Sequence, residues 1–200
     1  MFMEVKIKKK LERFQLAVEF SSDCRRIGIL GASGSGKSLL LRSLAGVESA
    51  DEGKIVICGR TLLDTEQKIC EKPQKRKVGY LFQNYALFPT MTVEENIMAG
   101  LLVSPREKRQ KAAQYMEKFQ LKGLEKRLPH ELSGGQQQRA ALARMMICEP
   151  EVILLDEPFS ALDVYLRDQL QREMMEFLKE YSGTVILVSH SRDEILSLIH

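Results

Sequence analysis

The fold of this chain is decided by one stretch, Gly31-Ala32-Ser33-Gly34-Ser35-Gly36-Lys37-Ser38. The stretch fits the pattern G-x-x-x-x-G-K-[ST], in which a glycine-rich loop leads from a strand into a helix. The apolar run from Arg26 to Leu30 precedes it and predicts a buried strand. The run from Leu39 to Ala45 follows it as an apolar-faced helix, and Gly46 predicts where that helix ends. Strand, loop and helix therefore stand in the order that the pattern requires.

This loop has the chemistry of a phosphate site. Backbone N–H groups at the start of a helix, and the positive end of the helix dipole, attract anions. A Cβ atom at Gly34 or Gly36 would occupy the space of a phosphate oxygen. We expect Lys37 to reach the β- and γ-phosphates of a nucleotide, and the Ser38 hydroxyl to take one position around Mg²⁺. The alternative for the same residues is a turn that ends in a solvated lysine.

Length and composition limit the class of protein. The 200 residues suit one large α/β domain, or one with an inserted subdomain, and 44% hydrophobic residues are enough for a core. A net charge of +3 argues against a nucleic-acid partner, which needs a strongly basic face. The four cysteines lack C-x-x-C spacing, which favours a reduced, intracellular protein. No apolar run approaches the ~20 residues of a membrane span, so work at a membrane requires a partner.

The spacing of apolar residues predicts the other elements. Alternating polarity predicts antiparallel strands over Met3–Lys8 and Phe14–Phe20, with Lys8-Lys9-Lys10 as a solvated turn and Asp51-Glu52-Gly53 as another turn. Further strands are predicted over Lys54–Cys58, Val78–Gln83, Val152–Asp156 and Thr184–Ser189. Helices are predicted after Thr92, from Ser104 to Gln120, from Gln136 to Ile147, from Asp163 to Tyr181 and after Ser191.

Apolar strands that alternate with helices predict an α/β fold with a mainly parallel sheet. We expect a single domain over residues 1–200. Its core, with an N-terminal antiparallel β part, comprises residues 1–87 and 149–200. Residues 88–148 form a helical subdomain inserted between core strands.

Two carboxylates follow the strand over Val152–Asp156, because Asp156 ends the strand and Glu157 comes next. Downstream of a phosphate loop, a strand-end aspartate is expected to hold Mg²⁺ directly or through water. Glu157 is then placed to activate a water in line with the γ-phosphate. Without the phosphate loop, the same two residues would be an ordinary solvated strand end.

A second glycine-rich stretch, Leu132-Ser133-Gly134-Gly135-Gln136, precedes the helix that ends near Ile147. Ser133 suits the N-cap position of that helix. A second helix N-terminus, with exposed N–H groups and a serine hydroxyl, is thereby available to an anion. The alternative is an ordinary capped helix whose first turn is rich in glycine.

Taken in this order, the motifs resemble the nucleotide-binding subunit of ATP-binding cassette (ABC) transporters. The resemblance covers essentially the whole chain. Residues 31–38 resemble the Walker A loop of that family, residues 132–136 its signature, and Asp156-Glu157 its Walker B pair. Three further positions resemble other family motifs: Gln83 the Q-loop glutamine, Ser160-Ala161-Leu162-Asp163 the D-loop, and His190 the switch histidine.

The resemblance implies a P-loop NTPase fold of the RecA-like type, with ATP and Mg²⁺ as cofactors. It assigns catalytic roles to Glu157, His190, Gln83 and Lys37, and metal contacts to Ser38, Gln83 and Asp156. Nucleotide contacts are assigned to residues 31–38 and, from a second subunit, to Ser133, Gly134, Gly135 and Asp163. In the family two subunits pack head to tail around two ATP molecules, and hydrolysis opens the interface.

The stretch from Gly79 to Pro89 resembles the importer branch of the family, which takes up molybdate, sulfate, polyamines, iron or sugars. The resemblance implies an ATPase that powers import, and we expect molybdate or a similar oxyanion as the solute. The implied partners are a second copy or a paralogous cassette, membrane permease subunits and, indirectly, a solute-binding protein. The implied location is cytoplasmic, on the inner face of the membrane.

Two features depart from the family pattern. Family members place an aromatic residue upstream of the phosphate loop against the adenine, and Phe14 is the candidate here. Family members also continue with further strands beyond the point that corresponds to His200.

Two alternative functions remain: a soluble cassette ATPase, which needs a coiled-coil insertion or two cassettes, and a non-hydrolysing ATP-gated dimer module. Glu157 argues against the second, because degenerate cassettes often lack that carboxylate.

Overall fold

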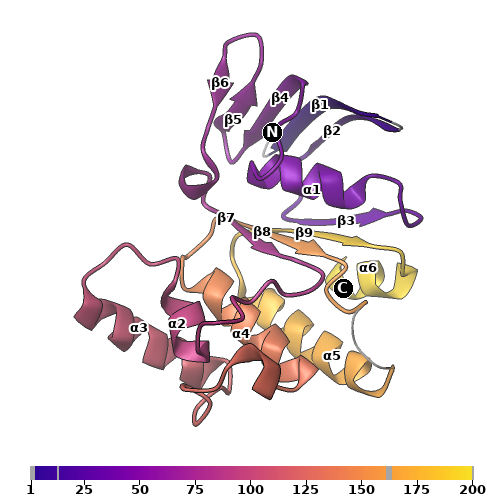
Figure 1. Cartoon of the computed structure of the whole chain (residues 1–200). Helices are drawn as coiled ribbons and strands as arrows, with labels where there is room; N and C mark the ends of the chain where they lie inside the picture. Colours follow the sequence, from indigo (N-terminus) through magenta and orange to yellow (C-terminus); the bar gives the residue numbers. More distant parts are fainter. Residues whose placement is uncertain (1–2, 13, 161–163, 200) are drawn as a thin grey trace.

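The computed structural model describes residues 3–12, 14–160 and 164–199. Four layers are stacked in it: an antiparallel sheet, helix α1 (Lys37–Ala45), a parallel sheet, and a layer of helices (Figure 1). Helix α1 is therefore covered by a sheet on each side. The phosphate loop, which leads into α1, lies at one end of the parallel sheet.

The parallel sheet is the predicted core. Its strands follow the order β3 (Arg26–Leu30), β9 (Thr184–Ser189), β8 (Val152–Asp156) and β7 (Val78–Leu81). Every residue of the two central strands, β8 and β9, is buried, as expected for strands that have helices on both faces. Since all four strands are parallel, their carboxyl ends share one edge, and the loops that follow them gather there.

The antiparallel sheet is larger than the sequence predicted. It has the order β2 (Phe14–Ser22), β1 (Met3–Leu11), β4 (Glu52–Ile57), β5 (Arg60–Asp64) and β6 (Ile69–Cys70). The predicted lysine turn is wrong, because Lys8, Lys9 and Lys10 belong to β1. The predicted Asp51-Glu52-Gly53 turn is also wrong in part, because β4 begins at Glu52.

Pairing between distant strands explains both differences. Lys8 stands opposite Glu52 in the β1–β4 register, and their side chains form an ion pair at 3.3 Å. The Lys9 ammonium lies 3.2 Å from the Asp51 carboxylate. Opposite charges on facing residues stabilise a sheet, and a pattern of local polarity does not reveal them.

Helix α1 joins the two sheets through one apolar core. Its buried leucines pack between the antiparallel sheet and the face of the parallel sheet that carries Val152 and Leu154. The helix ends at Gly46, as predicted, where φ is +77°. The buried guanidinium of Arg76 donates to the carbonyls of Ser43 and Leu44 at 2.9 Å each, which satisfies the helix C-terminus.

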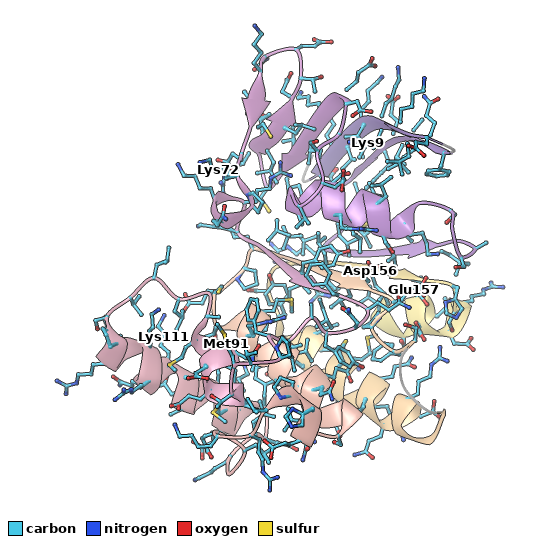
Figure 2. The ribbon with its side chains drawn as sticks, viewed as in Figure 1. Lys9, Lys72, Met91, Lys111, Asp156 and Glu157 are labelled. Carbon is cyan, nitrogen blue, oxygen red and sulfur yellow. The ribbon has the colours of Figure 1, made fainter. Side chains whose placement is uncertain are left out.

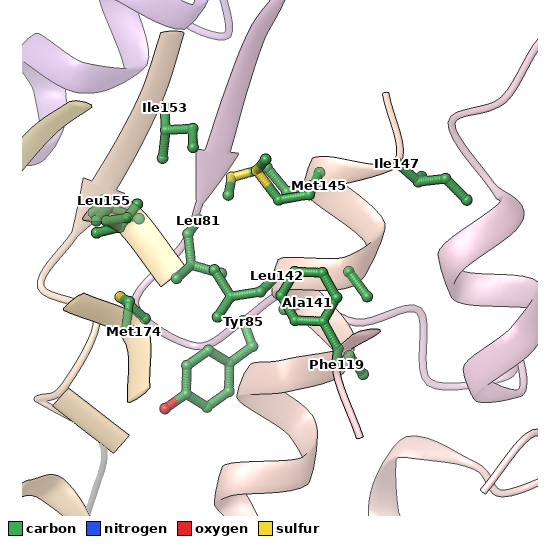
Figure 3. Close-up of a cluster of buried hydrophobic side chains, with 14 of the residues drawn as sticks. Leu81, Tyr85, Phe119, Ala141, Leu142, Met145, Ile147, Ile153, Leu155 and Met174 are labelled. Atoms are coloured by element: carbon green, nitrogen blue, oxygen red, sulfur yellow. The ribbon is translucent and has the colours of Figure 1, made fainter. Parts of the chain in front are cut away.

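The helical layer covers the opposite face of the parallel sheet. It comprises α2 (Val93–Met98), α3 (Pro105–Lys118), α4 (Gly134–Met146), α5 (Val164–Glu180) and α6 (Arg192–Ile199), with short 3₁₀ helices at Pro73–Lys75 and Pro129–Glu131. Both predicted capping boxes are present, at Thr92 and at Ser104. A second apolar core, which includes Leu81, Leu142 and Leu155, joins these helices to the sheet (Figure 3).

Candidate nucleotide-binding site

The glycine-rich loop connects β3 to α1 as predicted. The Gly31 amide donates to the Ser189 carbonyl at 3.4 Å, which ties the loop to the end of the neighbouring strand β9. Gly34 and Gly36 have φ values of +78° and +92°, which L side chains rarely adopt. A Cβ atom on Gly36 would also lie 2.9 Å from the Phe14 ring. This glycine is therefore required both by the loop conformation and by the packing of β2 against it.

Lys37 is folded back onto the loop. Its ammonium donates to the carbonyls of Gly31 at 2.8 Å and Ala32 at 2.9 Å, and only 7% of the residue is exposed. The same ammonium lies 3.4 Å from Oε1 of Glu157. A buried cation is thus held where the N–H groups of the loop and of the α1 start gather, which is an environment suited to phosphates.

The end of β8 brings Asp156 to this loop. The Ser38 hydroxyl donates to Oδ1 of Asp156 at 2.8 Å. The carboxylate is buried, and among the described residues no cationic side chain lies within ion-pair distance of it. A buried carboxylate beside a hydroxyl, both of them hard oxygen ligands, fits a site for Mg²⁺. The residues present therefore match the cofactor that the sequence predicted.

Glu157 lies between two basic side chains. Figure 2 shows it beside Asp156 at the end of β8. Its Oε2 lies 3.3 Å from Nδ1 of His190, while its Oε1 faces the Lys37 ammonium. The backbone of Glu157 has φ of +45°, and its amide donates to the Val188 carbonyl at 3.1 Å. This left-handed conformation, uncommon for a residue with a side chain, is the kind of strain that functional sites contain.

An open cleft of about 420 Å³ gathers many of the predicted residues, while Asp156 and His190 lie beside it, in contact with Ser38 and Glu157. Its lining includes Ser33, Gly34, Gly36, Lys37, Ser38, Gln83 and Glu157. Gln83 lies two residues beyond the end of β7, so it stands in a turn and not in the strand where the sequence placed it. Phe14, the candidate for the adenine contact, also lines the cleft.

The second glycine-rich stretch lies elsewhere. Ser133 caps α4: its hydroxyl accepts from the Gln136 amide at 3.3 Å, and the Gln136 side chain accepts from the Ser133 amide at 2.9 Å. Within the described ranges, the lining of the cleft does not include Ser133, Gly134 or Gly135. Gly135 is buried, and a Cβ atom there would lie 3.2 Å from Leu170 on α5. Asp163 lies outside the described residues.

Tyr80 was not among the residues predicted for the site, yet it contacts Asp156. Its hydroxyl donates to Oδ2 of Asp156 at 2.7 Å. Burial, and then the bond to this carboxylate, raise the pKa of Tyr80 well above its usual value. In the sequence, Tyr80 is only one residue of an apolar run, and it is the pairing of β7 with β8 that brings its hydroxyl to Asp156.

Comparison with known sequences identifies the family. Residues 17–160 match the sequence model of a family described as "ABC transporter". The chain belongs to the ABC transporter family. Its resemblance to ABC cassettes, predicted from the motifs, is thereby confirmed.

Relatives and solved structures agree with this assignment. The "Sulfate/thiosulfate import ATP-binding protein CysA 2" of Rhizobium meliloti is 44% identical over 98% of this chain and 55% of its own length. The CysA protein of Brucella melitensis is 48% identical over 86% of this chain and 48% of its own length. This chain therefore spans about half the length of the curated relatives it matches.

A solved dimer of the ATP-binding cassette MJ0796, bound to ADP and Pi, superposes with a TM-score of 0.78 and 26% identity. The match covers 98% of this chain and 91% of that one. The predicted P-loop NTPase fold is therefore confirmed. Within the described part of this cassette, no helix has the length and apolar character to cross a bilayer.

Proposed function

We propose that this cassette binds ATP with Mg²⁺ in the cleft beside the glycine-rich loop and hydrolyses it. The observation that carries the proposal is the meeting of Lys37, Glu157 and His190 at one point, with Ser38 and Asp156 paired beside them. These groups come from the loop and from the ends of β8 and β9. Their combination supplies a phosphate-binding cation, a metal-binding carboxylate and a general base.

The phosphates of ATP would bind to the amides of residues 31–38. On binding, the Lys37 ammonium would exchange its bonds to the Gly31 and Ala32 carbonyls for the β- and γ-phosphates. Ser38, Asp156 and Gln83 would hold Mg²⁺, which when bound neutralises charge on the β- and γ-phosphates. The Phe14 ring, exposed at the rim of the cleft, is available to the adenine.

Glu157 is the proposed general base. As a water oxygen bonds to the γ-phosphorus, the proton of that water passes to the Glu157 carboxylate. The bond between the γ-phosphorus and the bridging oxygen breaks, which leaves ADP and phosphate. We assign His190 and Gln83 to hold the γ-phosphate and the attacking water, because both stand at the ends of strands that border Glu157.

A second cassette would complete the site. Ser133, Gly134 and Gly135 stand apart from the cleft of their own chain, and we assign them, with Asp163, to the ATP bound on the opposite subunit. The solved cassette named above is described as dimeric, which supports this arrangement. The partner is a second copy of this chain or a paralogous cassette.

We further propose that hydrolysis powers the import of an oxyanion through membrane permease subunits served by a solute-binding protein. The relatives named above are importers of sulfate and thiosulfate, and none of those named is a molybdate protein. We therefore favour sulfate or thiosulfate over molybdate. Four exposed apolar side chains flank α2 in the chain: Phe88 and Met91 precede it, and Leu102 and Val103 follow it. They are available to a permease. The cassette would then be peripheral on the inner face of the membrane.

Phosphate release from ATP tests the proposed activity. The purified chain is expected to release phosphate only with Mg²⁺ present. Glu157→Gln should keep ATP binding and lose turnover by about 10²–10⁴-fold, because the base is removed while the phosphate contacts stay. Lys37→Ala serves as the contrasting variant and should weaken ATP binding itself. Unchanged turnover in Glu157→Gln would remove Glu157 from the base role.

Solute choice is tested with the assembled transporter. Vesicles that contain this cassette and its permease should take up labelled sulfate when ATP is supplied on the cassette side. Excess unlabelled thiosulfate should reduce that uptake more than molybdate does. Uptake of molybdate in preference to sulfate would reverse the solute assignment.

A further inference from the structure

The metal-binding carboxylate has a neutral donor on each of its oxygens. Oδ1 of Asp156 accepts from the Ser38 hydroxyl at 2.8 Å, and Oδ2 accepts from the Tyr80 hydroxyl at 2.7 Å. Ser38 comes from the start of α1 and Tyr80 from β7, and both of these elements precede β8 in the chain. Two donors on two oxygens fix the plane of the carboxylate.

The Tyr80 hydroxyl is itself held in place. Strand β7 pairs with β8 in parallel, with Tyr80 opposite Leu154, and the Tyr80 ring packs 4.3 Å from the Phe82 ring, measured between centroids. The side chain is half-buried and contacts the apolar core around α1. Its contacts with Phe82 and with this core restrict the rotation of the ring. Within the described residues, the Tyr80 hydroxyl makes one hydrogen bond, to Asp156, and neither of these two residues lines the cleft itself.

We propose that Tyr80 is a positioning residue for the metal site, an inference that rests on the proposed function. By holding Oδ2, the Tyr80 hydroxyl keeps Oδ1 turned toward Ser38, where Mg²⁺ bound to ATP would lie. Without this bond, a buried oxygen would lack its donor and the carboxylate could rotate away from Ser38. Partners that orient a metal ligand in this way typically change metal affinity by about 10–100-fold.

Equilibrium binding of a fluorescent ATP analogue, mant-ATP, separates the metal effect from the nucleotide effect. In EDTA, Tyr80→Phe should bind mant-ATP as the wild-type chain does, because the hydroxyl lies outside the cleft. When Mg²⁺ is titrated in, the concentration that gives half of the affinity gain should rise about ten-fold. The substitution keeps the ring, so the contact with Phe82 is preserved.

Tyr181→Phe is the matched control. Its hydroxyl also makes one bond of 2.7 Å, to the Pro150 carbonyl, but it lies outside the cleft and does not contact Asp156. This variant should show the wild-type Mg²⁺ dependence.

An unchanged Mg²⁺ dependence in Tyr80→Phe would overturn the proposal. So would a loss of mant-ATP binding in EDTA, because the hydroxyl would then support the loop and not the metal. Failure of the proposed function looks different: the wild-type chain itself would not bind mant-ATP, or would bind it without any response to Mg²⁺.

Discussion

At the scale of single residues, the chemistry of the cleft depends on which polar atoms are already paired and which are free to react. Glu157 uses one oxygen toward Lys37 and the other toward His190. If Lys37 moves to the phosphates of ATP, one oxygen of Glu157 becomes free to accept a proton from water. This movement would break the ion pair between Lys37 and Glu157, so that the Glu157 carboxylate could act as a base. Nucleotide binding would thereby be linked to activation of the water.

Residues named by a local motif could be predicted from the sequence. Lys37, Ser38, Asp156 and Glu157 could be found because each belongs to a short pattern whose strand or helix context is visible nearby. Tyr80 could not be found, because its partner is Asp156, 76 positions away. The role of Tyr80 depends on β7 lying beside β8, and a local pattern of polarity does not reveal the order of strands in a sheet.

Another buried tyrosine makes a testable contrast. Tyr85 is 4% exposed, and among the described residues its hydroxyl has no hydrogen-bond partner. Tyr85→Phe removes this unpaired polar atom, so the free energy of unfolding should rise by about 1 kcal/mol in urea titrations. Tyr181→Phe should lower it by about 1 kcal/mol, because the bond to the Pro150 carbonyl is lost. Equal losses in both variants would mean that the Tyr85 hydroxyl has a partner.

The burial of Tyr85 also predicts how the free energy of unfolding depends on pH. Burial raises the pKa of Tyr85 to about 12, whereas the pKa of an unfolded tyrosine is about 10. The unfolded chain thus loses its proton first, and wild-type stability should fall as pH rises from about 10 to about 12. Tyr85→Phe lacks this group and should lose less stability over that interval. A parallel decline of the two proteins would contradict the burial of this hydroxyl.

At the scale of elements, one arginine joins the loop after Gln83 to helix α4. Arg144 donates to the carbonyls of Tyr85 at 2.9 Å and Ala86 at 2.8 Å. Both of those residues have left-handed backbones, with φ of 59° and 44°. The Arg144 guanidinium also lies 5.1 Å from the centre of the Phe88 ring. Helix α4 begins at the Ser133 cap, so a single side chain links the segment after Gln83 to the signature helix.

Arg144→Met should loosen this segment. Losing two bonds to carbonyls that hold a strained backbone should lower the free energy of unfolding by about 2–3 kcal/mol. Limited proteolysis should cut residues 83–88 faster in this variant. Arg139→Met is the control on the same helix, since it removes one exposed bond to Gln120 and should leave residues 83–88 protected. Equal protection of residues 83–88 from proteolysis in both variants would contradict the stabilising role of Arg144.

Elements built from sequence neighbours were predicted more accurately than those built from distant pairs. The capping boxes at Thr92 and Ser104 and the strand Thr184–Ser189 depend on adjacent residues, and all three are present. Lys8, Lys9 and Lys10 were expected in a turn, because their place in β1 depends on pairing with the distant strand β4. The strands β5 and β6 were missed for another reason: they are hairpin neighbours of β4, but their short runs do not alternate in polarity.

At the scale of the whole molecule, the two predicted parts of the site lie at separate places on the cassette. The loop over residues 31–38 and the strand ends form the cleft, while Ser133 stands at the exposed end of α4. The sequence predicted both parts, and the resemblance to the family predicted that they meet only between subunits. That meeting remains a proposal, and it leads to a clear expectation about assembly.

The central claim is that ATP joins two cassettes through Ser133, and light scattering measures this most directly. With ATP and Mg²⁺, the Glu157→Gln chain should change from the mass of one chain to that of two, because bound ATP is not consumed. Adding Ser133→Arg should keep ATP binding but leave single chains. Ser104→Arg is the matched control, because it removes a similar capping box from α3 and should leave the dimer intact. A dimer that forms equally well with Ser133→Arg would contradict the composite site.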